Sequence, residues 1–289
     1  MKNGLALSAE SPPAWLLQEF TAGVGMVRGE YLQRDCEAYI TEPDVGRRVT
    51  QYLVQIAKLA APDLVWYRTS DLDASEAAVL RGVEDAFLEP VPHLGIRGIR
   101  RSLRFPDSFR HELSAFRVAQ QQCPNLRLLF PFVTTMDEAE AAKRYARAAG
   151  VEGNLGLMAE TPAAVLTLPE MLDAGYSHVL VGCNDLWALT MAEIRRPGNY
   201  PTATVALGRL LELARKHTQD RDATLCFAGY LDAALIEMAE YTGVDAIVYH
   251  YAQLPALLGE RYADLPDLEL LAEIKQRTRA AVARLNHVT

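Results

Sequence analysis

The sequence predicts an α/β protein that folds as a single (β/α)8 TIM barrel. Eight short runs of apolar and β-branched residues recur along the chain, and stretches with helical spacing of apolar residues separate them. This alternation is typical of a parallel sheet covered by helices, and eight strand–helix units suffice to close a barrel. The length of 289 residues suits one such domain, and no linker rich in Gly, Ser or Pro divides residues 1–289.

Each predicted strand is a short apolar run bounded by turn-forming or charged residues. The eight runs are Leu5–Ala9, Val24–Arg28, Leu64–Arg68, Leu126–Phe132, Leu155–Ala159, His178–Gly182, Thr224–Phe227 and Ala246–His250. The connection after the third run, from Thr69 to Asn125, is longer than one crossover helix requires. Connections of excess length are often functional, so this segment is a candidate for part of the site.

The stretches between the strands have the apolar spacing of amphipathic helices. One stretch has five apolar residues on one helical face: Val45, Val49, Leu53, Ile56 and Ala60. Another begins with Thr135 and Glu138, which form a capping box before residues 139–149. The last stretch, from Leu268 to Leu285, predicts a closing helix.

Composition argues against several classes of function. The 29 Lys and Arg residues against 37 Asp and Glu give a formal net charge of −8, which disfavours nucleic acid as a partner. No apolar run reaches the roughly 18 residues of a membrane span and no signal peptide is recognisable, so we expect a cytoplasmic protein without membrane contact. The four cysteines form no C-x-x-C pair, which argues against a zinc site or a disulfide framework.

The carboxyl ends of the predicted strands carry a chemically coherent set of side chains. In (β/α)8 barrels the reactive residues lie where strands end. These positions hold Arg28, Arg68, Glu160, Asn184, Asp185 and Cys226. Glu160 and Asp185 follow neighbouring strands, which in a parallel sheet lie about 4.8 Å apart, so the two carboxylates would meet. A hard divalent cation such as Mg²⁺ relieves their repulsion, and we expect both acids to be its ligands.

Arginines surround the expected metal site. Arg28 and Arg68, with Arg97 and Arg195 from loops, present forked donors that suit phosphate or carboxylate oxygens. A metal ion ringed by arginines predicts a small anionic substrate with several charges. Cys226 adds a thiol that is able to protonate a carbanion or an enolate.

Each of these residues also has a structural interpretation. Glu160 precedes Thr161-Pro162 and Asp185 precedes a helical run, so either acid would serve equally as a helix cap. Arginines at a barrel rim often form surface ion pairs of roughly 0–1 kcal/mol. Cys226 also fits as a small buried side chain. The joint arrangement, rather than any single residue, favours the functional interpretation.

The same residues stand in motifs that resemble those of the C-terminal phosphoenolpyruvate/pyruvate-binding barrel of the PEP-utilising enzymes. This family includes phosphoenolpyruvate synthase, pyruvate phosphate dikinase and enzyme I of the bacterial phosphotransferase system. The similar segments are Gly23–Leu32, Tyr67–Asp71, Leu94–Arg100, Pro131–Val133 with Glu138-Ala139, Met158–Pro162 and Gly182–Leu186. The last two match best, and the motifs follow the family's order over nearly the whole chain.

The resemblance implies roles for individual residues. The family's magnesium ligands correspond to Glu160 and Asp185, and its proton donor for pyruvate enolate corresponds to Cys226. The residues that would hold phosphoenolpyruvate or pyruvate are Arg28, Arg68, Arg97, Asn184 and Arg195. A homodimer is also expected, because relatives of this domain form dimers.

The sequence departs from the family pattern in the site and in its domains. Phe227 replaces the glycine after the cysteine, Trp187 replaces a threonine, and His250 replaces an asparagine or serine. We expect Trp187 and Phe227 to narrow or desolvate the pocket, while Asp73 makes the third-strand loop more negative; neutral drift would also explain these changes. We expect residues 1–289 to hold neither an ATP-grasp domain nor a phosphohistidine domain.

Three functions follow, in order of preference. The first is a Mg²⁺-dependent enzyme that transfers a phosphoryl group between phosphoenolpyruvate and a phosphohistidine on a separate carrier protein, through a pyruvate enolate. The second is a stand-alone Mg²⁺-dependent lyase or aldolase that acts on the enolate of pyruvate or another 2-oxo acid. The third is a non-catalytic ligand-binding protein, which the joint retention of the acids, the arginines and Cys226 disfavours.

Overall fold

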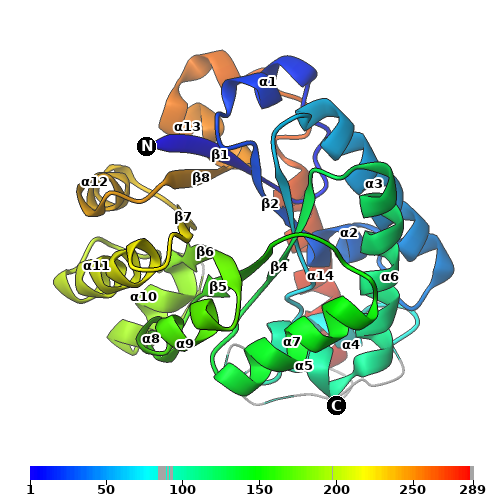
Figure 1. Ribbon diagram of the computed structural model, residues 1–289. Coiled ribbons are helices and arrows are strands. Elements are labelled where there is room, and N and C mark those ends of the chain that lie inside the picture. Colours follow the sequence, from blue (N-terminus) through cyan, green and yellow to red (C-terminus); the bar gives the residue numbers. More distant parts are fainter. Residues whose placement is uncertain (84–88, 90, 92–93, 197, 287–289) are drawn as a thin grey trace.

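The computed structural model of the chain is a closed barrel of eight parallel strands, as the sequence predicts (Figure 1). It describes residues 1–83, 89, 91, 94–196 and 198–286. The strands are β1 (Lys2–Leu7), β2 (Val24–Arg28), β3 (Val65–Arg68), β4 (Leu126–Phe130), β5 (Leu155–Ala159), β6 (Tyr176–Gly182), β7 (Thr224–Ala228) and β8 (Ala246–His250). They pair in sequence order, and β8 closes the barrel on β1.

The helices alternate with the strands and cover the outside of the barrel (Figure 1). They are α1 (Ala14–Glu19), α2 (Gly29–Asp35), α3 (Pro43–Ala60), α4 (Ala74–Ala78), α5 (Gly98–Arg104), α6 (Pro106–Gln122), α7 (Met136–Ala148), α8 (Pro162–Leu166), α9 (Leu168–Asp173), α10 (Cys183–Met191), α11 (Val205–Gln219), α12 (Ala233–Thr242), α13 (Leu254–Leu258) and α14 (Leu270–Asn286), with 3-10 turns η2 (Tyr251–Gln253) and η3 (Glu260–Tyr262). The long connection between β3 and β4 contains α4, α5 and α6.

Local sequence signals explain where two of these helices begin. The Thr135 hydroxyl accepts the Glu138 N–H at the start of α7, and the Glu138 carboxylate accepts the Thr135 N–H, which confirms the predicted capping box. Asp73 and Glu76 make the same reciprocal arrangement at α4. The charge of Asp73 therefore stabilises a helix start in the loop after β3.

Alternation along the strands divides the core into two layers. Side chains that point outward pack against the helices, and the helix α3 contributes all five of its predicted apolar residues to this layer. Side chains that point inward form a smaller cluster that fills the barrel: Ala6, Met26, Trp66, Leu129, Met158, Leu180, Cys226, Ala228, Ala246 and Val248. Within the barrel Trp66 stacks on His178 at 3.9 Å between ring centroids, and burial lowers the pKa of His178 to about 3. The barrel is therefore a packed core rather than a channel.

In the part of the chain that the structure describes, no helix is both long enough and apolar enough to cross a bilayer.

Candidate active site at the carboxyl ends of the strands

Strand ends deliver the charged residues that the sequence singles out. Arg28 and Arg68 are the last residues of β2 and β3, and Glu160 directly follows β5. Asp185 lies in the first turn of α10, three residues beyond the end of β6. Each of the four side chains is less than one-tenth exposed. Because all strands are parallel, these residues gather at one end of the barrel.

Arg97 joins two aspartates at this end. Its Nε and Nη2 donate to the two carboxylate oxygens of Asp71 at 3.0 and 2.6 Å. Its Nη1 donates to Asp185 Oδ1 at 3.1 Å, and its guanidinium lies 4.7 Å from the ring centroid of Phe132. A forked guanidinium that is shared between two buried carboxylates is a rigid, charge-assisted arrangement.

Arg195 gives Asp185 a second guanidinium partner. Its Nη1 donates to Asp185 Oδ1 at 2.6 Å from the segment after α10. Burial alone would raise the pKa of Asp185, but Arg97 and Arg195 outweigh that effect and lower the pKa to about 2. The Arg195 side chain is 34% exposed, so of these two arginines it has more freedom to leave Asp185 for a ligand.

Glu160 is held in a different way. Its Oε2 accepts the backbone N–H of Phe132 at 2.9 Å, and Phe132 adopts the left-handed backbone conformation with φ of 55°. A Cβ on Gly182 would lie 2.5 Å from Glu160 Oε1, so only glycine leaves room for the carboxylate there. Burial raises the pKa of Glu160 to about 8, and the nearby charges of Asp185 and Asp71 add to that rise.

Neither acid is a helix cap. Thr161 is the N-cap of α8, and its hydroxyl accepts the Ala164 N–H at 3.0 Å. Gly182 is the N-cap of α10. The capping interpretation of Glu160 and Asp185 is therefore wrong, and their burial needs another explanation.

The donor chemistry of this pair fits a magnesium ion. Among the described residues no donor reaches Glu160 Oε1, and the carboxylates of Glu160, Asp185 and Asp71 repel one another. In the described part of the chain no three acidic, His or Cys side chains form a complete metal cage. Magnesium commonly binds through one or two carboxylates and takes its other ligands from water and substrate phosphate. Glu160 and Asp185 are the residues that would hold such an ion, and Asp185 would then exchange one of its guanidinium partners for it.

Arg68 is fixed by acids that the sequence interpretation did not single out. It forms ion pairs with Glu30 and, at 3.6 Å, with Asp71. Glu30 Oε2 is buried without a hydrogen-bond partner in the described structure. The spacing offered a signal for both acids, because Glu30 follows Arg28 by two residues and Asp71 follows Arg68 by three.

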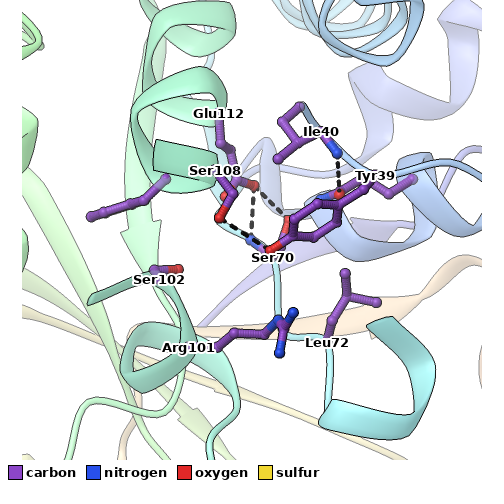
Figure 2. A pocket seen from close by; sticks show the side chains of 10 residues that line it. Tyr39, Ile40, Ser70, Leu72, Arg101, Ser102, Ser108 and Glu112 are labelled. Atoms are coloured by element: carbon purple, nitrogen blue, oxygen red, sulfur yellow. Dashed lines mark hydrogen bonds between the residues drawn. The ribbon is translucent and has the colours of Figure 1, made fainter. Parts of the chain in front are cut away.

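Glu112 on α6 holds the end of β3 in place through hydrogen bonds (Figure 2). Its Oε1 accepts the Tyr67 hydroxyl at 2.8 Å, the Ser70 N–H at 2.8 Å and the Ser70 hydroxyl at 2.7 Å. Burial raises the pKa of Glu112 to about 7 in spite of these donors. A cavity of about 10 Å³ adjoins the group, which is roughly the space for one water molecule. No pattern in the sequence marks Glu112, because α6 meets β3 only in the folded chain.

Cys226 lies deeper than its expected position. Cys226 points into the barrel, and in the register of β6 and β7 it pairs with Leu180. Gly182, which lies beside Glu160, pairs with Ala228, two residues further along β7. Cys226 therefore lies two residues, or about 6.6 Å of strand, below the level of Glu160. Burial raises the pKa of its thiol to about 12, so the thiol stays protonated near neutral pH.

The three expected pocket changes occupy different positions in the structure. Phe227 is fully buried in the outer layer between strands and helices, because it alternates with the inward residues Cys226 and Ala228. Trp187 also packs in that outer layer. Phe227 therefore does not line the pocket, whereas an effect of Trp187 on the pocket stays a prediction. His250, at the end of β8, does lie beside the site, where burial and the charges of Arg28, Lys275 and Arg68 lower its pKa well below the ordinary value.

Asn184 contacts a neighbouring loop. Its Oδ1 accepts the N–H of Tyr230, which follows β7, at 2.9 Å. Asn184 thus fixes the β7–α12 connection at the rim of the site. Arg28 donates to Ser8 after β1, and its guanidinium lies 4.3 Å from the ring centroid of Tyr31.

Comparison with known proteins adds a family. Residues 13–253 match the PEP-binding domain of the PEP-utilising enzymes. A probable phosphoenolpyruvate synthase of Archaeoglobus fulgidus is 30% identical over 214 residues, which make up 68% of this chain and 28% of that protein. A phosphoenolpyruvate-protein phosphotransferase of Streptomyces coelicolor is 32% identical over 177 residues, or 61% of this chain and 31% of that protein. An HpcH/HpaI aldolase structure from Desulfitobacterium hafniense aligns with a TM-score of 0.47 at 14% identity, over 86% of each chain. The chain spans less than a third of the length of these two curated relatives.

Proposed function

Because the chain belongs to the PEP-utilising enzymes through their PEP-binding domain, we propose that it binds phosphoenolpyruvate or pyruvate together with Mg²⁺. We further propose that it transfers a phosphoryl group between phosphoenolpyruvate and a phosphohistidine on a separate carrier protein, through a pyruvate enolate. The relatives named as phosphoenolpyruvate synthase and as phosphoenolpyruvate-protein phosphotransferase support the substrate class.

One observation carries this proposal. Two buried carboxylates, Glu160 and Asp185, meet Arg68, Arg97 and Arg195 at the carboxyl end of the barrel. A site that balances acids with guanidinium groups suits a ligand that brings both a cation and several negative charges. When bound at Glu160 and Asp185, Mg²⁺ would supply positive charge that stabilises the charge developing during phosphoryl transfer.

The chain's own residues would divide the remaining work. Arg28, Arg68 and Arg195 orient the phosphate and carboxylate oxygens, and their rigid forks leave little side-chain entropy to lose. Arg97 keeps Asp71 and Asp185 in position through its ion pairs with both. Cys226 holds its proton at neutral pH, because the pKa of its thiol is about 12, and would deliver that proton to the methylene carbon of the enolate.

Proton exchange on pyruvate tests the enolate part of the proposal. Pyruvate and MgCl₂ are incubated with the protein in D₂O, and the loss of the methyl proton signal is followed by NMR. We expect exchange with the wild type, none with Glu160→Ala or Cys226→Ala, and wild-type exchange with Cys123→Ala, because Cys123 is buried at the end of α6. Absence of exchange in the wild type would contradict the proposal.

Phosphoryl transfer needs a separate test. The protein is mixed with ³²P-labelled phosphoenolpyruvate and Mg²⁺, with and without an added histidine phosphocarrier protein. We expect label on the carrier, sensitive to acid as phosphohistidine is, and pyruvate release only when the carrier is present. Turnover of phosphoenolpyruvate without a carrier would argue against the transfer as proposed.

A second candidate is a lyase or aldolase that uses the same enolate. His250 favours it, because a half-buried neutral imidazole whose buried Nδ1 has no partner in the described structure is able to exchange a proton with an aldehyde oxygen. A panel of aldehydes with pyruvate and Mg²⁺, analysed for new hydroxy-oxo acids, would reveal this activity. Condensation that disappears in His250→Ala but survives in the wild type without a carrier would favour it over phosphoryl transfer.

A further inference from the structure

The C-terminal helix α14 reaches the same end of the barrel from outside the family-matched segment. The match ends at residue 253, and α14 spans Leu270–Asn286. Figure 1 shows α14 beside α2 and α4, the helices that follow β2 and β3. Arg34 of α2 donates through Nε to Thr278 Oγ1 of α14 at 3.0 Å, and Asp35 pairs with Arg277 at 3.0 Å. The position of α14 over this part of the rim is therefore fixed by specific contacts.

Lys275 lies on the inner face of α14. It stands one helical turn from Thr278, which contacts Arg34, and it follows the fully buried Ile274. Lys275 is itself half-buried, and among the described residues no carboxylate or other acceptor reaches its ammonium group. Burial and the neighbouring guanidinium groups of Arg28 and Arg34 lower its pKa to about 8. The helix thus brings a positive charge to a region that already holds positive charges.

Arg28 is the buried neighbour that also lacks an acidic partner. It is 7% exposed, and in the described structure its Nε makes no hydrogen bond and no carboxylate lies within ion-pair distance. Its guanidinium and that of Arg34 lie 4.3 and 4.7 Å from the ring centroid of Tyr31. Arg34 has an acidic partner, since it pairs with Glu76 at 2.8 Å. The unbalanced charge is therefore concentrated on Arg28 and Lys275.

His250 completes this group from β8. Its Nδ1 is buried without a hydrogen-bond partner in the described structure, and its electrostatic neighbours are Arg28, Lys275 and Arg68. Three nitrogen-bearing side chains from β2, β8 and α14 thus lie near enough to influence one another's charge, and Arg28 Nε and His250 Nδ1 have no hydrogen-bond partner in the described structure. Buried donors and charges of this kind are costly unless a ligand satisfies them.

We propose that Lys275, brought by α14, forms with Arg28 and His250 a binding subsite for the phosphate group of the substrate. The subsite makes α14 a substrate-binding element that lies beyond the family-matched barrel. A phosphate carries about 1.5 to 2 negative charges at neutral pH and accepts several hydrogen bonds. A guanidinium, an ammonium and an imidazole together therefore suit a phosphate ligand better than they suit a single carboxylate ligand. The choice of phosphoenolpyruvate as the source of that phosphate rests on the proposed function, whereas binding of the phosphate group itself does not.

Binding of inorganic phosphate to the full chain tests the subsite directly. Isothermal titration at constant ionic strength compares the wild type with Lys275→Met, Lys275→Arg and Arg284→Met. Arg284 is an exposed residue of the same helix, so its variant makes the same change in net charge away from the subsite. We expect Lys275→Met to weaken phosphate binding about tenfold or more, Arg284→Met to leave it unchanged, and Lys275→Arg to retain most of it. Equal phosphate affinity in all four proteins would overturn the proposal.

Two substrates separate this inference from the proposed function. Pyruvate has no phosphate, so Lys275→Met should raise the KM for phosphoenolpyruvate about tenfold and should change the KM for pyruvate in methyl exchange by less than about twofold. Wild-type exchange and transfer with an unaltered KM in Lys275→Met would overturn the subsite and leave the function intact. Phosphate binding that depends on Lys275, in a wild type that processes neither substrate, would support the subsite and contradict the function. Unchanged thermal unfolding of Lys275→Met shows that the helix remains in place.

Discussion

Arg97 and Asp185 are joined by two hydrogen bonds, Nη1 to Oδ1 at 3.1 Å and Nη2 to Oδ2 at 3.4 Å, although they are 88 residues apart. Both side chains are nearly fully buried, and Arg97 also pairs with Asp71. Asp71 lies in the loop after β3, Arg97 is the N-cap of α5, and Asp185 lies in the first turn of α10. This contact therefore ties distant parts of the barrel rim together at the point where the proposed chemistry takes place.

Removal of Arg97 should destabilise the fold. Arg97→Gln leaves Asp71 and Asp185 buried without a full counter-charge, and breaking a buried ion pair in this way costs roughly 3–5 kcal/mol. Urea unfolding of the variant should show a loss of that size in the free energy of unfolding. Arg144→Gln is the control, because Arg144 forms an exposed pair with Glu140 at 3.9 Å and should cost less than about 1 kcal/mol. Equal effects of the two changes would contradict the structural role of Arg97.

Magnesium should stabilise the wild type through Glu160. Binding to the folded state alone raises the melting temperature, by about 2–4 °C for each kcal/mol of linked binding energy. Glu160→Gln keeps a carbonyl oxygen for the Phe132 N–H but loses the charge, so it should fold and lose the magnesium effect. Glu170→Gln, an exposed acid on α9, should keep it. Differential scanning fluorimetry with MgCl₂ and with NaCl of equal ionic strength measures both. A magnesium shift that Glu160→Gln retains would exclude Glu160 as a ligand.

Stability should depend on pH through Glu112. Its pKa rises from 4.5 to about 7 on folding, so the folded state favours the protonated carboxyl. The contribution of Glu112 to the free energy of unfolding should be greatest below pH 4.5 and should fall as the pH rises through 7, by about 3 kcal/mol for a shift of this size. Glu112→Gln has no such proton, so it should gain stability relative to the wild type between pH 5 and pH 8. Glu237→Gln, an exposed change, should follow the wild type. Parallel pH profiles of wild type and Glu112→Gln would disprove this assignment.

Gly29 should not tolerate a side chain. A Cβ at this position would lie 2.5 Å from the Tyr67 hydroxyl and 2.8 Å from the Arg68 carbonyl oxygen. Gly29→Ala should therefore destabilise by about 1–3 kcal/mol and weaken substrate binding, because it displaces the end of β3. Gly46 on α3 has no atom within 4 Å of such a Cβ, so Gly46→Ala should stabilise by about 0.5–1 kcal/mol. Thermal unfolding of the two variants should shift in opposite directions.

Much of the fold could be predicted, because strand identity depends on local patterns. The expected bounds of Val24–Arg28, Leu155–Ala159 and Ala246–His250 agree with the structure. The first strand begins earlier than expected, because Lys2 and its neighbours pair with β8 although they are polar or small. That pairing is a tertiary effect, which apolar periodicity does not reveal.

The site was predictable only where chemistry follows strand ends. Glu160, Arg28 and Arg68 lie at such positions, so barrel geometry brings them together. Phe227 was misjudged because the sequence alone does not fix which face of β7 it occupies; one step of alternation moves a side chain from the mouth to the outer layer. Lys275 could not be predicted, since α14 comes near Arg28 only through the packing of its own face on α2.

The double hold of Arg97 on Asp71 and Asp185 means that the acidic centre carries its own counter-charge. The guanidinium of Arg97 thus balances part of the charge of both carboxylates. A cation that binds at Asp185 would replace a guanidinium group as the partner of that carboxylate. Of the two guanidinium partners of Asp185, the half-exposed Arg195 would be the one to give up its place, while Arg97 keeps its hold on Asp71.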